Sequence, residues 1–90
     1  MHEPIPLPID GVLDLHTFNP REVGELVRDY LEACRERGIF QLRIIHGKGT
    51  GRLREVVRQA LHQHPHVRSF EPGGEKEGGE GVTVAMLATG

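Results

Sequence analysis

The 90-residue sequence contains no tryptophan, one tyrosine, three phenylalanines and a single cysteine. With so few aromatic side chains, the core must be built from Leu, Val and Ile, and a chain of this length supports one small domain. The lone Cys34 excludes an internal disulfide and favours a reducing compartment, because small secreted domains normally need several bridges. No apolar run approaches the roughly 20 residues that cross a bilayer. We therefore expect a soluble, monomeric domain in the cytoplasm, with no membrane association.

The formal net charge of -2 hides an uneven distribution along the chain. Between positions 43 and 68 there are six basic residues and one acidic residue, whereas residues 1–37 hold eight acids and four bases. A basic centre between acidic ends is compatible with nucleic acid meeting one face of the domain. An ordinary solvated helix face would give the same pattern, so charge alone does not decide between the two.

Prolines at every second position from 4 to 8 predict that residues 1–10 form an extended arm, because proline cannot donate to a regular ladder. The domain itself is then expected to occupy residues 11–90.

Two amphipathic helices are predicted. Asn19 supplies a side-chain cap and Pro20 the first helical position of a helix that should run to about Arg37. Apolar residues recur along it at three- and four-residue steps. A second helix with the same periodicity should begin near Thr50 and end before Pro65.

Four segments read as strands: 12–15, 40–46, 67–70 and 82–88. The acidic, glycine-rich segment 71–81 between the last two is expected to be a mobile loop. A strand, a helix and another strand form a right-handed parallel unit. The order β-α-β-α-β-β therefore predicts an α/β fold of the α+β two-layer type, with two helices on one face of a mixed four-stranded sheet.

Asp14 and His16 stand at the end of the first predicted strand. Alternation along a strand places these two on one face and Leu13 with Leu15 on the other. A carboxylate beside an imidazole can fix the tautomer of the ring and raise its basicity, which is what a general base requires. The alternative is an aspartate that caps a turn and a histidine that only satisfies it.

The segment HGKGTG at 46–51, followed by Arg52, connects a strand to a helix. Alternate glycines let backbone N–H groups approach an anion, and the helix directs its positive end to the same point. Lys48 and Arg52 add side-chain charge. The spacing differs from nucleoside-triphosphate and dinucleotide loops, so a backbone phosphate is the favoured ligand. A tight turn that needs glycine only for its dihedral angles is the alternative.

Two further features are interpreted as structural. His62, His64 and His66 alternate around Pro65, so their rings need not converge on a metal ion. Cys34 lies on the apolar face of the first helix and is expected to be buried packing.

Together, Leu13-Asp14-Leu15-His16 and the downstream segment 46–51 resemble the two signature motifs of the Smr (small MutS-related) family, L-D-L-H-G and H-G-x-G-x-G. The resemblance covers about Gly11 to Ala88 and suggests a short stand-alone member. It implies a fold similar to the C-terminal domain of bacterial translation initiation factor three. It also implies endonuclease activity on RNA or on branched or nicked DNA, with the ribosome as a further partner. One departure is Thr17, where the family has glycine.

From the motifs and the resemblance we assign catalytic roles to Asp14, His16 and His46. The residues assigned to phosphate or nucleic-acid binding are Gly47, Lys48, Gly49, Thr50, Gly51, Arg52 and Arg54. RNA, whose 2′-hydroxyl can act as nucleophile, needs no metal, whereas DNA would call for a divalent ion such as Mg²⁺ or Mn²⁺ on Asp14. The hypothesis is thus a hydrolase or RNA-cleaving nuclease. The alternatives are a non-catalytic module that recognises nucleic-acid or ribosome structure, and a small-molecule phosphate enzyme.

Overall fold

The computed structural model describes residues 8–75 and 79–89. Along the chain these form β1 (Val12–Asp14), α1 (Pro20–Glu36), β2 (Gln41–Ile45), α2 (Arg52–Gln63), β3 (Val67–Pro72), the 3-10 turn η2 (Gly79–Gly81) and β4 (Val82–Leu87). The predicted element order is confirmed. The arm predicted for residues 1–10 lies mostly outside the described residues.

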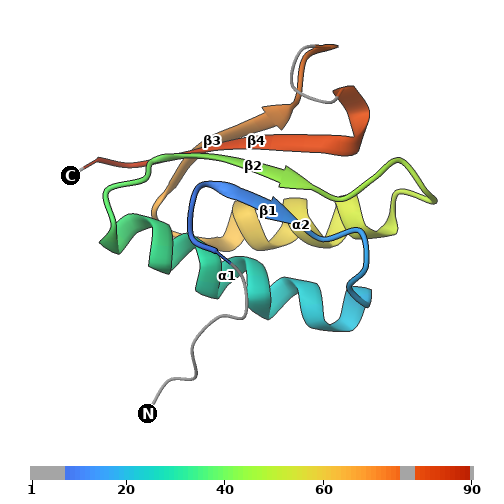
Figure 1. Cartoon of the computed structure of the whole chain (residues 1–90), viewed down its shortest axis with the longest axis horizontal. Coiled ribbons are helices and arrows are strands. Elements are labelled where there is room, and N and C mark those ends of the chain that lie inside the picture. The colour runs from blue at the N-terminus through green and yellow to red at the C-terminus, as the bar shows by residue number, and fades with distance from the viewer. Residues whose placement is uncertain (1–7, 76–78, 90) are drawn as a thin grey trace.

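The four strands form one mixed sheet in the order β1-β2-β4-β3. β1 runs parallel to β2, and β4 pairs antiparallel with both β2 and β3. Both helices lie against the same face of this sheet, while its other face has no helix over it (Figure 1). Because side chains alternate along a strand, Leu13 and Ile44 are paired neighbours that point into the helix layer, and both are buried. The predicted two-layer architecture is therefore confirmed.

α1 begins where the sequence indicated. The Asn19 side chain accepts a hydrogen bond from the Arg21 N–H at 3.0 Å, and Pro20 occupies the first helical position. The apolar face then packs into the core, through the buried residues Val23, Val27, Tyr30, Leu31 and Cys34. Burying each such side chain stabilises the fold by about 1.5–3 kcal/mol. Cys34 is buried in the core, as expected from its place on the apolar face. This burial raises the pKa of its thiol.

Tyr30 fixes the start of β1 to the helix layer. Its hydroxyl oxygen accepts the N–H of Gly11 at 3.0 Å and that of Asp10 at 3.3 Å, and it lies 3.2 Å from the Val12 carbonyl oxygen, to which it can donate. The surrounding burial raises the pKa of Tyr30. The strand that carries Asp14 is thus held by a buried side chain of α1.

Two boundaries differ from the sequence prediction by two residues, and several others differ by one. α2 begins at Arg52, two residues later than expected, because Gly51 takes a left-handed conformation with φ 84° and ends the loop. β3 continues to Pro72, into the segment predicted to be a mobile loop, since antiparallel pairing with β4 extends to Pro72 and Thr83. Of that segment, residues 76–78 lie outside the described part.

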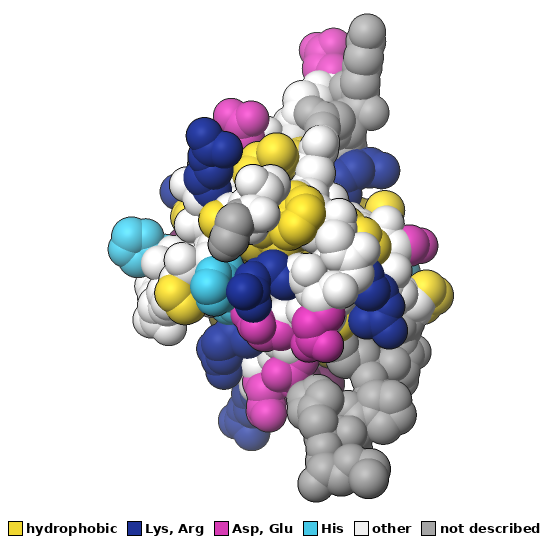
Figure 2. Space-filling view, turned by 90° about the vertical axis from the view of Figure 1, so that its left-hand side faces the viewer, with side chains coloured by type: hydrophobic (Ala, Val, Ile, Leu, Met, Phe, Trp, Pro, Cys, Tyr) yellow, Lys and Arg dark blue, Asp and Glu magenta, His cyan; other side chains and the backbone are white. Residues whose placement is uncertain are grey.

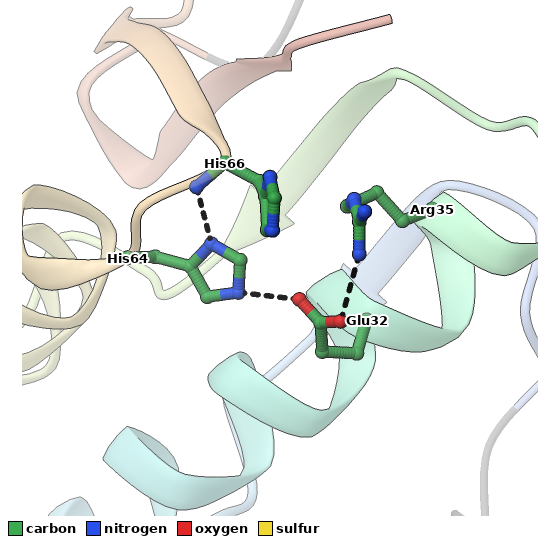
Figure 3. Close-up of polar contacts among 4 residues, drawn as sticks. All are labelled: Glu32, Arg35, His64 and His66. Carbon is green, nitrogen blue, oxygen red and sulfur yellow. Dashed lines mark hydrogen bonds and ion pairs between the residues drawn. The ribbon is translucent and has the colours of Figure 1, made fainter. Parts of the chain in front are cut away.

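The C-terminal ends of the two helices are joined by a polar network (Figure 3). The His64 Nε2 lies 2.8 Å from one Glu32 oxygen, and Arg35 donates to the other at 3.0 Å. His64 Nδ1 accepts the His66 backbone N–H at 3.1 Å, so the ring proton resides on Nε2. Nε2 of His64 therefore links the end of α2 to α1, while Nδ1 fixes the turn that leads into β3.

The end of the molecule that carries this network lies opposite the glycine loop, residues 46–51 (Figure 1). Figure 2 faces that end and shows acidic and basic side chains intermingled around an exposed hydrophobic patch. Charges of both signs in close alternation do not produce a field that attracts a polyanion. This end of the molecule is therefore a poor candidate for binding a polyanion.

Candidate nucleic-acid interface

The motif residues come together at one edge of the sheet because β1 and β2 are parallel. Asp14 is paired with Ile45, and the Leu15 N–H donates to the Ile45 carbonyl at 2.7 Å. The segments that follow, which begin with His16 and His46, therefore leave the sheet side by side (Figure 1). Open α/β sheets usually bind ligands at such carboxyl ends.

Asp14 and His16 form a close exposed pair. The His16 Nδ1 lies 2.6 Å from Asp14 Oδ1, and the His16 backbone N–H donates to the same oxygen at 3.1 Å. The two side chains are 49% and 64% exposed. The hydrogen bond from the His16 ring is the main cause that lowers the pKa of Asp14. An ionised carboxylate only accepts, so Nδ1 holds the proton and the Nε2 lone pair is directed away from Asp14.

The glycine loop, residues 46–51, is anchored at its base to the start of β4. The Gly81 carbonyl accepts the backbone N–H groups of both His46 and Gly47, each at 3.0 Å. Gly47 and Gly51 have φ values of 80° and 84°, which a residue with a side chain adopts only with strain. Two of the three alternate glycines are thus required by the backbone.

The starts of both helices flank one hollow, which is lined by Pro20, His46, Gly47, Gly49, Thr50, Gly51, Arg52, Leu53 and Arg54. α1 has its Asn19 cap, whereas Gly51 at the start of α2 has no side chain, and the first turn donates only to the Thr50 hydroxyl, from the Arg52 N–H at 3.4 Å. A helix start carries N–H groups and a partial positive charge that suit an anion. The cations Arg52 and Arg54 are exposed on the same turn. Amides and cations in this arrangement are suited to an anion.

A second hollow lies on the other side of the loop, lined by Lys48, Arg54 and Glu80 together with residues 47 and 49–51. Arg54 therefore lines both hollows. All seven residues that sequence analysis assigned to phosphate or nucleic-acid binding lie within this one region. His16 does not line either hollow, but it lies in the turn that leads to Pro20, which does.

His46 is buried, in contrast to His16. Its Nδ1 lies 3.0 Å from the Gly47 carbonyl, which can only accept, so Nδ1 carries the proton. Nε2 lies 2.9 Å from the Thr83 hydroxyl and must accept from it. Burial lowers the pKa of His46, which keeps the ring neutral. With both nitrogens engaged, the ring is arranged to connect the loop, β2 and β4.

His46 should make the stability of the domain depend on pH. Its pKa is lowered in the fold from an ordinary 6.5, so below about pH 6.5 the unfolded chain takes up a proton that the folded chain refuses, and stability falls. We expect H46Q to lower the free energy of unfolding by about 1–3 kcal/mol at neutral pH, since its partners lose their matched hydrogen bonds. The difference in the free energy of unfolding between wild type and H46Q should become smaller near pH 5. Urea titrations at neutral pH and at pH 5 measure this difference, and an unchanged value would contradict a neutral, buried His46.

Sequence analysis missed several contributors to this region. Gly81 directly precedes β4 and Thr83 lies within it, far along the chain from the loop. Nothing in the local sequence marks either residue as a partner of the loop. Glu80 lay in the segment predicted to be a mobile loop. Pro20 was recognised as the start of a helix, but not as a residue that lines the hollow.

Thr17 occupies the position at which the Smr motif has glycine. In the described residues no residue other than glycine has a positive φ. Thr17 therefore adopts a conformation open to any side chain, and its turn into α1 does not need the freedom of glycine.

The sheet edge offers few ligands to a divalent metal ion. Among residues 8–75 and 79–89 there is no cluster of three or more His, Cys, Asp or Glu side chains arranged for a metal. Asp14 is a single carboxylate whose Oδ1 is already engaged by His16. Within the same residues, no helix is both long enough and apolar enough to traverse a bilayer.

The fold and the loop define a class: a small two-layer α+β domain that presents a glycine-rich turn beside an exposed Asp-His pair. Comparison with known proteins gives the family. The Smr domain model matches residues 13–88, and the chain belongs to the Smr family.

The relatives found are longer proteins. Proteins named Endonuclease MutS2 from Caldicellulosiruptor bescii and Symbiobacterium thermophilum are 51% and 47% identical over 79 and 75 residues, which is 88% and 83% of this chain. The chain spans only 10% of the length of either relative.

Two solved structures share the fold. The Smr domain of Thermus thermophilus MutS2 superposes with a TM-score of 0.82 at 40% identity, covering 88% of this chain and 99% of that one. YdaL, a stand-alone small MutS-related protein from Escherichia coli, gives 0.81 at 23% identity, covering 89% and 66%. The latter likeness concerns the fold alone.

Proposed function

We propose that this domain binds the backbone of a nucleic acid at the glycine loop and cleaves a phosphodiester bond of RNA, with His16 as general base. The observation that carries the proposal is the exposed imidazole of His16, oriented by Asp14, at the same sheet edge as the glycine loop and the start of α2, with three cations beside them. Backbone amides and cations would hold the phosphate, while the base acts on the neighbouring sugar. The endonuclease name of the longer relatives supports this choice.

The chemistry needs one proton acceptor at a defined atom. Nδ1 of His16 is hydrogen-bonded to Asp14, so Nε2 is the atom that would take the proton from a ribose 2′-hydroxyl. The 2′-oxygen then forms a bond to phosphorus as the bond to the 5′-oxygen breaks, which leaves a cyclic phosphate on one fragment and a 5′-hydroxyl, protonated from solvent, on the other. Asp14 stays ionised and stabilises the imidazolium that forms. Lys48 and Arg52 would offset the charge that develops on the phosphate oxygens.

RNA is the better substrate for these residues because its nucleophile is built in. Hydrolysis of DNA would have to activate water, for which a divalent ion and several carboxylates are the usual arrangement. Among residues 8–75 and 79–89, no three His, Cys, Asp or Glu side chains come together in such an arrangement. We therefore assign no step to a metal ion.

One observation favours a second candidate, a non-catalytic module that recognises nucleic-acid structure. His46, the other imidazole of the motifs, is buried and neutral, so a second exposed acid-base group to protonate the leaving oxygen is missing from the motif residues. Such a module would bind through the same cations without producing fragments.

Incubation with end-labelled single-stranded RNA and DNA, with and without chelator, tests both candidates. We expect RNA fragments that end in a cyclic phosphate, at equal rates with and without chelator, and intact DNA. Cleavage that chelator abolishes would contradict the metal-free mechanism. Binding without fragments from either substrate would establish the recognition module instead.

A further inference from the structure

One carboxylate lies beside the glycine loop, among groups that otherwise suit an anion. Glu80 is part of η2 and directly precedes Gly81, whose carbonyl accepts two backbone N–H groups of the loop. η2 therefore meets the loop at one end of the sheet (Figure 1). Glu80 is exposed, and it lines the same hollow as Lys48 and Arg54. Neither sequence motif includes this acid.

The backbone holds Glu80 in place on both sides. Gly81 is buried against the loop, where a Cβ added to it would lie 3.6 Å from the Lys48 Cγ. On the other side, the Gly79 N–H donates to the Gly74 carbonyl at 2.9 Å. The side-chain stem of Lys48 therefore lies next to η2, and the position of the acid at the loop is fixed by hydrogen bonds and packing.

Glu80 differs from the other charged groups of this hollow in the hydrogen bonds it can make. The Lys48 ammonium and the Arg54 guanidinium can only donate, whereas an ionised carboxylate can only accept. Within residues 8–75 and 79–89, none of these three side chains takes part in an ion pair. The carboxylate is therefore available to a donor group of a ligand whose phosphate the cations hold.

A site for phosphate alone does not explain a carboxylate at this point. Glu80 repels the phosphate that Lys48 and Arg54 attract, which weakens the binding of a polyanion unless the ligand offers something in return. A hydrogen bond to an ionised group is one of the stronger kinds, so a donor next to the phosphate would offset the repulsion. RNA carries such a donor at each nucleotide, the ribose 2′-hydroxyl, and DNA does not.

We propose that Glu80 accepts a hydrogen bond from a ribose 2′-hydroxyl and thereby selects RNA over DNA. The inference rests on the proposed nucleic-acid binding and adds to it a residue that recognises the sugar. The hollow has an empty volume of about 520 Å³, open solvent included. Because one water takes up about 30 Å³, this is more space than the four oxygens of a phosphate need.

The recognised sugar is not the one that reacts. Pro20, which follows the turn of His16, lines the other hollow and not the one that Glu80 lines. The hydroxyl bound by Glu80 therefore belongs to a neighbouring nucleotide, on the far side of the loop from the proposed base. Glu80 is a residue for substrate selection, and its removal is expected to change affinity.

Affinities for labelled single-stranded RNA and DNA of one sequence, measured by anisotropy in the H16A background so that the RNA stays intact, test the inference. H16A should bind the RNA more tightly than the DNA, and in H16A/E80A this preference should fall by roughly 10-fold or more. The DNA should bind at least as tightly to H16A/E80A as to H16A, since a repulsive charge is gone. RNA with 2′-fluorine in place of the hydroxyl cannot donate, and E80A should not weaken its binding.

Two further variants in the same background make the result specific. E80Q keeps an acceptor oxygen without the charge, so it should retain part of the preference for RNA. E36A removes an exposed carboxylate at the C-terminal end of α1 and should retain all of it. Thermal melting of each variant shows that the fold is kept. Equal gains on RNA and DNA in E80A would make Glu80 a source of repulsion only, and equal losses would assign it to a group that both share; either result would overturn the inference.

The experiment separates this inference from the proposed function. If cations of the glycine loop are needed for binding but E80A leaves the ratio of RNA to DNA affinity unchanged, sugar recognition by Glu80 is wrong while backbone binding stands. If neither wild type nor H16A binds either oligonucleotide, the proposed function itself fails.

Discussion

H16A is expected to reduce cleavage of single-stranded RNA by roughly 100- to 10,000-fold, the range that a positioned general base contributes. His16 is exposed and contacts Asp14 through one ring nitrogen only, so its removal should leave the fold intact. RNA affinity should stay within a few-fold of wild type, because the cations that hold the phosphate are untouched. Rates from denaturing gels, with affinities from anisotropy, give both quantities.

D14N tests the role of the carboxylate that orients His16. An asparagine oxygen can still accept from the ring, but it no longer stabilises the imidazolium, so we expect a loss of rate smaller than that of H16A and no loss of binding. The pKa of Asp14 is lowered mainly by its hydrogen bond to His16, so the carboxylate is charged at neutral pH in wild type, and D14N removes that charge.

The matched control for H16A is H66A, which removes an imidazole directly before β3, beside the polar network of Glu32 and His64 (Figure 3). It should cleave RNA at the wild-type rate once thermal melting has confirmed folding. Full activity in H16A would remove the basis of the nuclease proposal. A loss of binding in parallel with the loss of rate would instead make His16 part of the binding surface.

The second large effect is expected on binding. Replacing Lys48 and Arg52 together with alanine should weaken RNA binding by roughly 100-fold or more, because each charge-assisted hydrogen bond to a phosphate contributes about 1.5–3 kcal/mol. Both side chains are exposed beside the glycine loop. The slope of log K against log salt should become shallower by about one for each cation that no longer neutralises a phosphate.

Two variants make that measurement specific. R37A removes an exposed arginine at the far end of α1 and should change neither affinity nor the salt slope appreciably. R52K keeps the charge but loses the planar fork, so its affinity should fall between wild type and R52A. If K48A/R52A and R37A were equally impaired, binding would depend on general charge rather than on the loop.

Local signals predicted the elements and their faces well. Asn19 and Pro20 marked the start of α1 because capping depends on neighbouring residues alone. Alternation along β1 correctly separated Leu13 and Leu15, which are buried, from Asp14 and His16, which are exposed. The start of α2 was predicted two residues early, since only the conformation of Gly51 shows where the loop ends.

The roles of the individual site residues remain predictions, but their environments differ in ways that the motifs could not indicate. His16 and His46 both follow parallel strands, but Asp14 is paired with Ile45, so His46 stands opposite the buried Leu15 and His16 lies one position further along. His16 is exposed at the sheet edge, whereas His46 is buried and hydrogen-bonded to Thr83, which lies 37 residues further along the chain.

The amino-acid sequence by itself determined the order of helices and strands, the residues that line the core, and the two motifs that end neighbouring parallel strands. These depend on periodicity, caps and turns, which act between residues a few positions apart. Only the tertiary structure decided that β4 lies between β2 and β3, that Gly81 and Thr83 support the glycine loop, and that Glu80 lines the hollow beside it. Those arrangements depend on interactions between distant segments, which form when the chain buries its apolar surface as a whole.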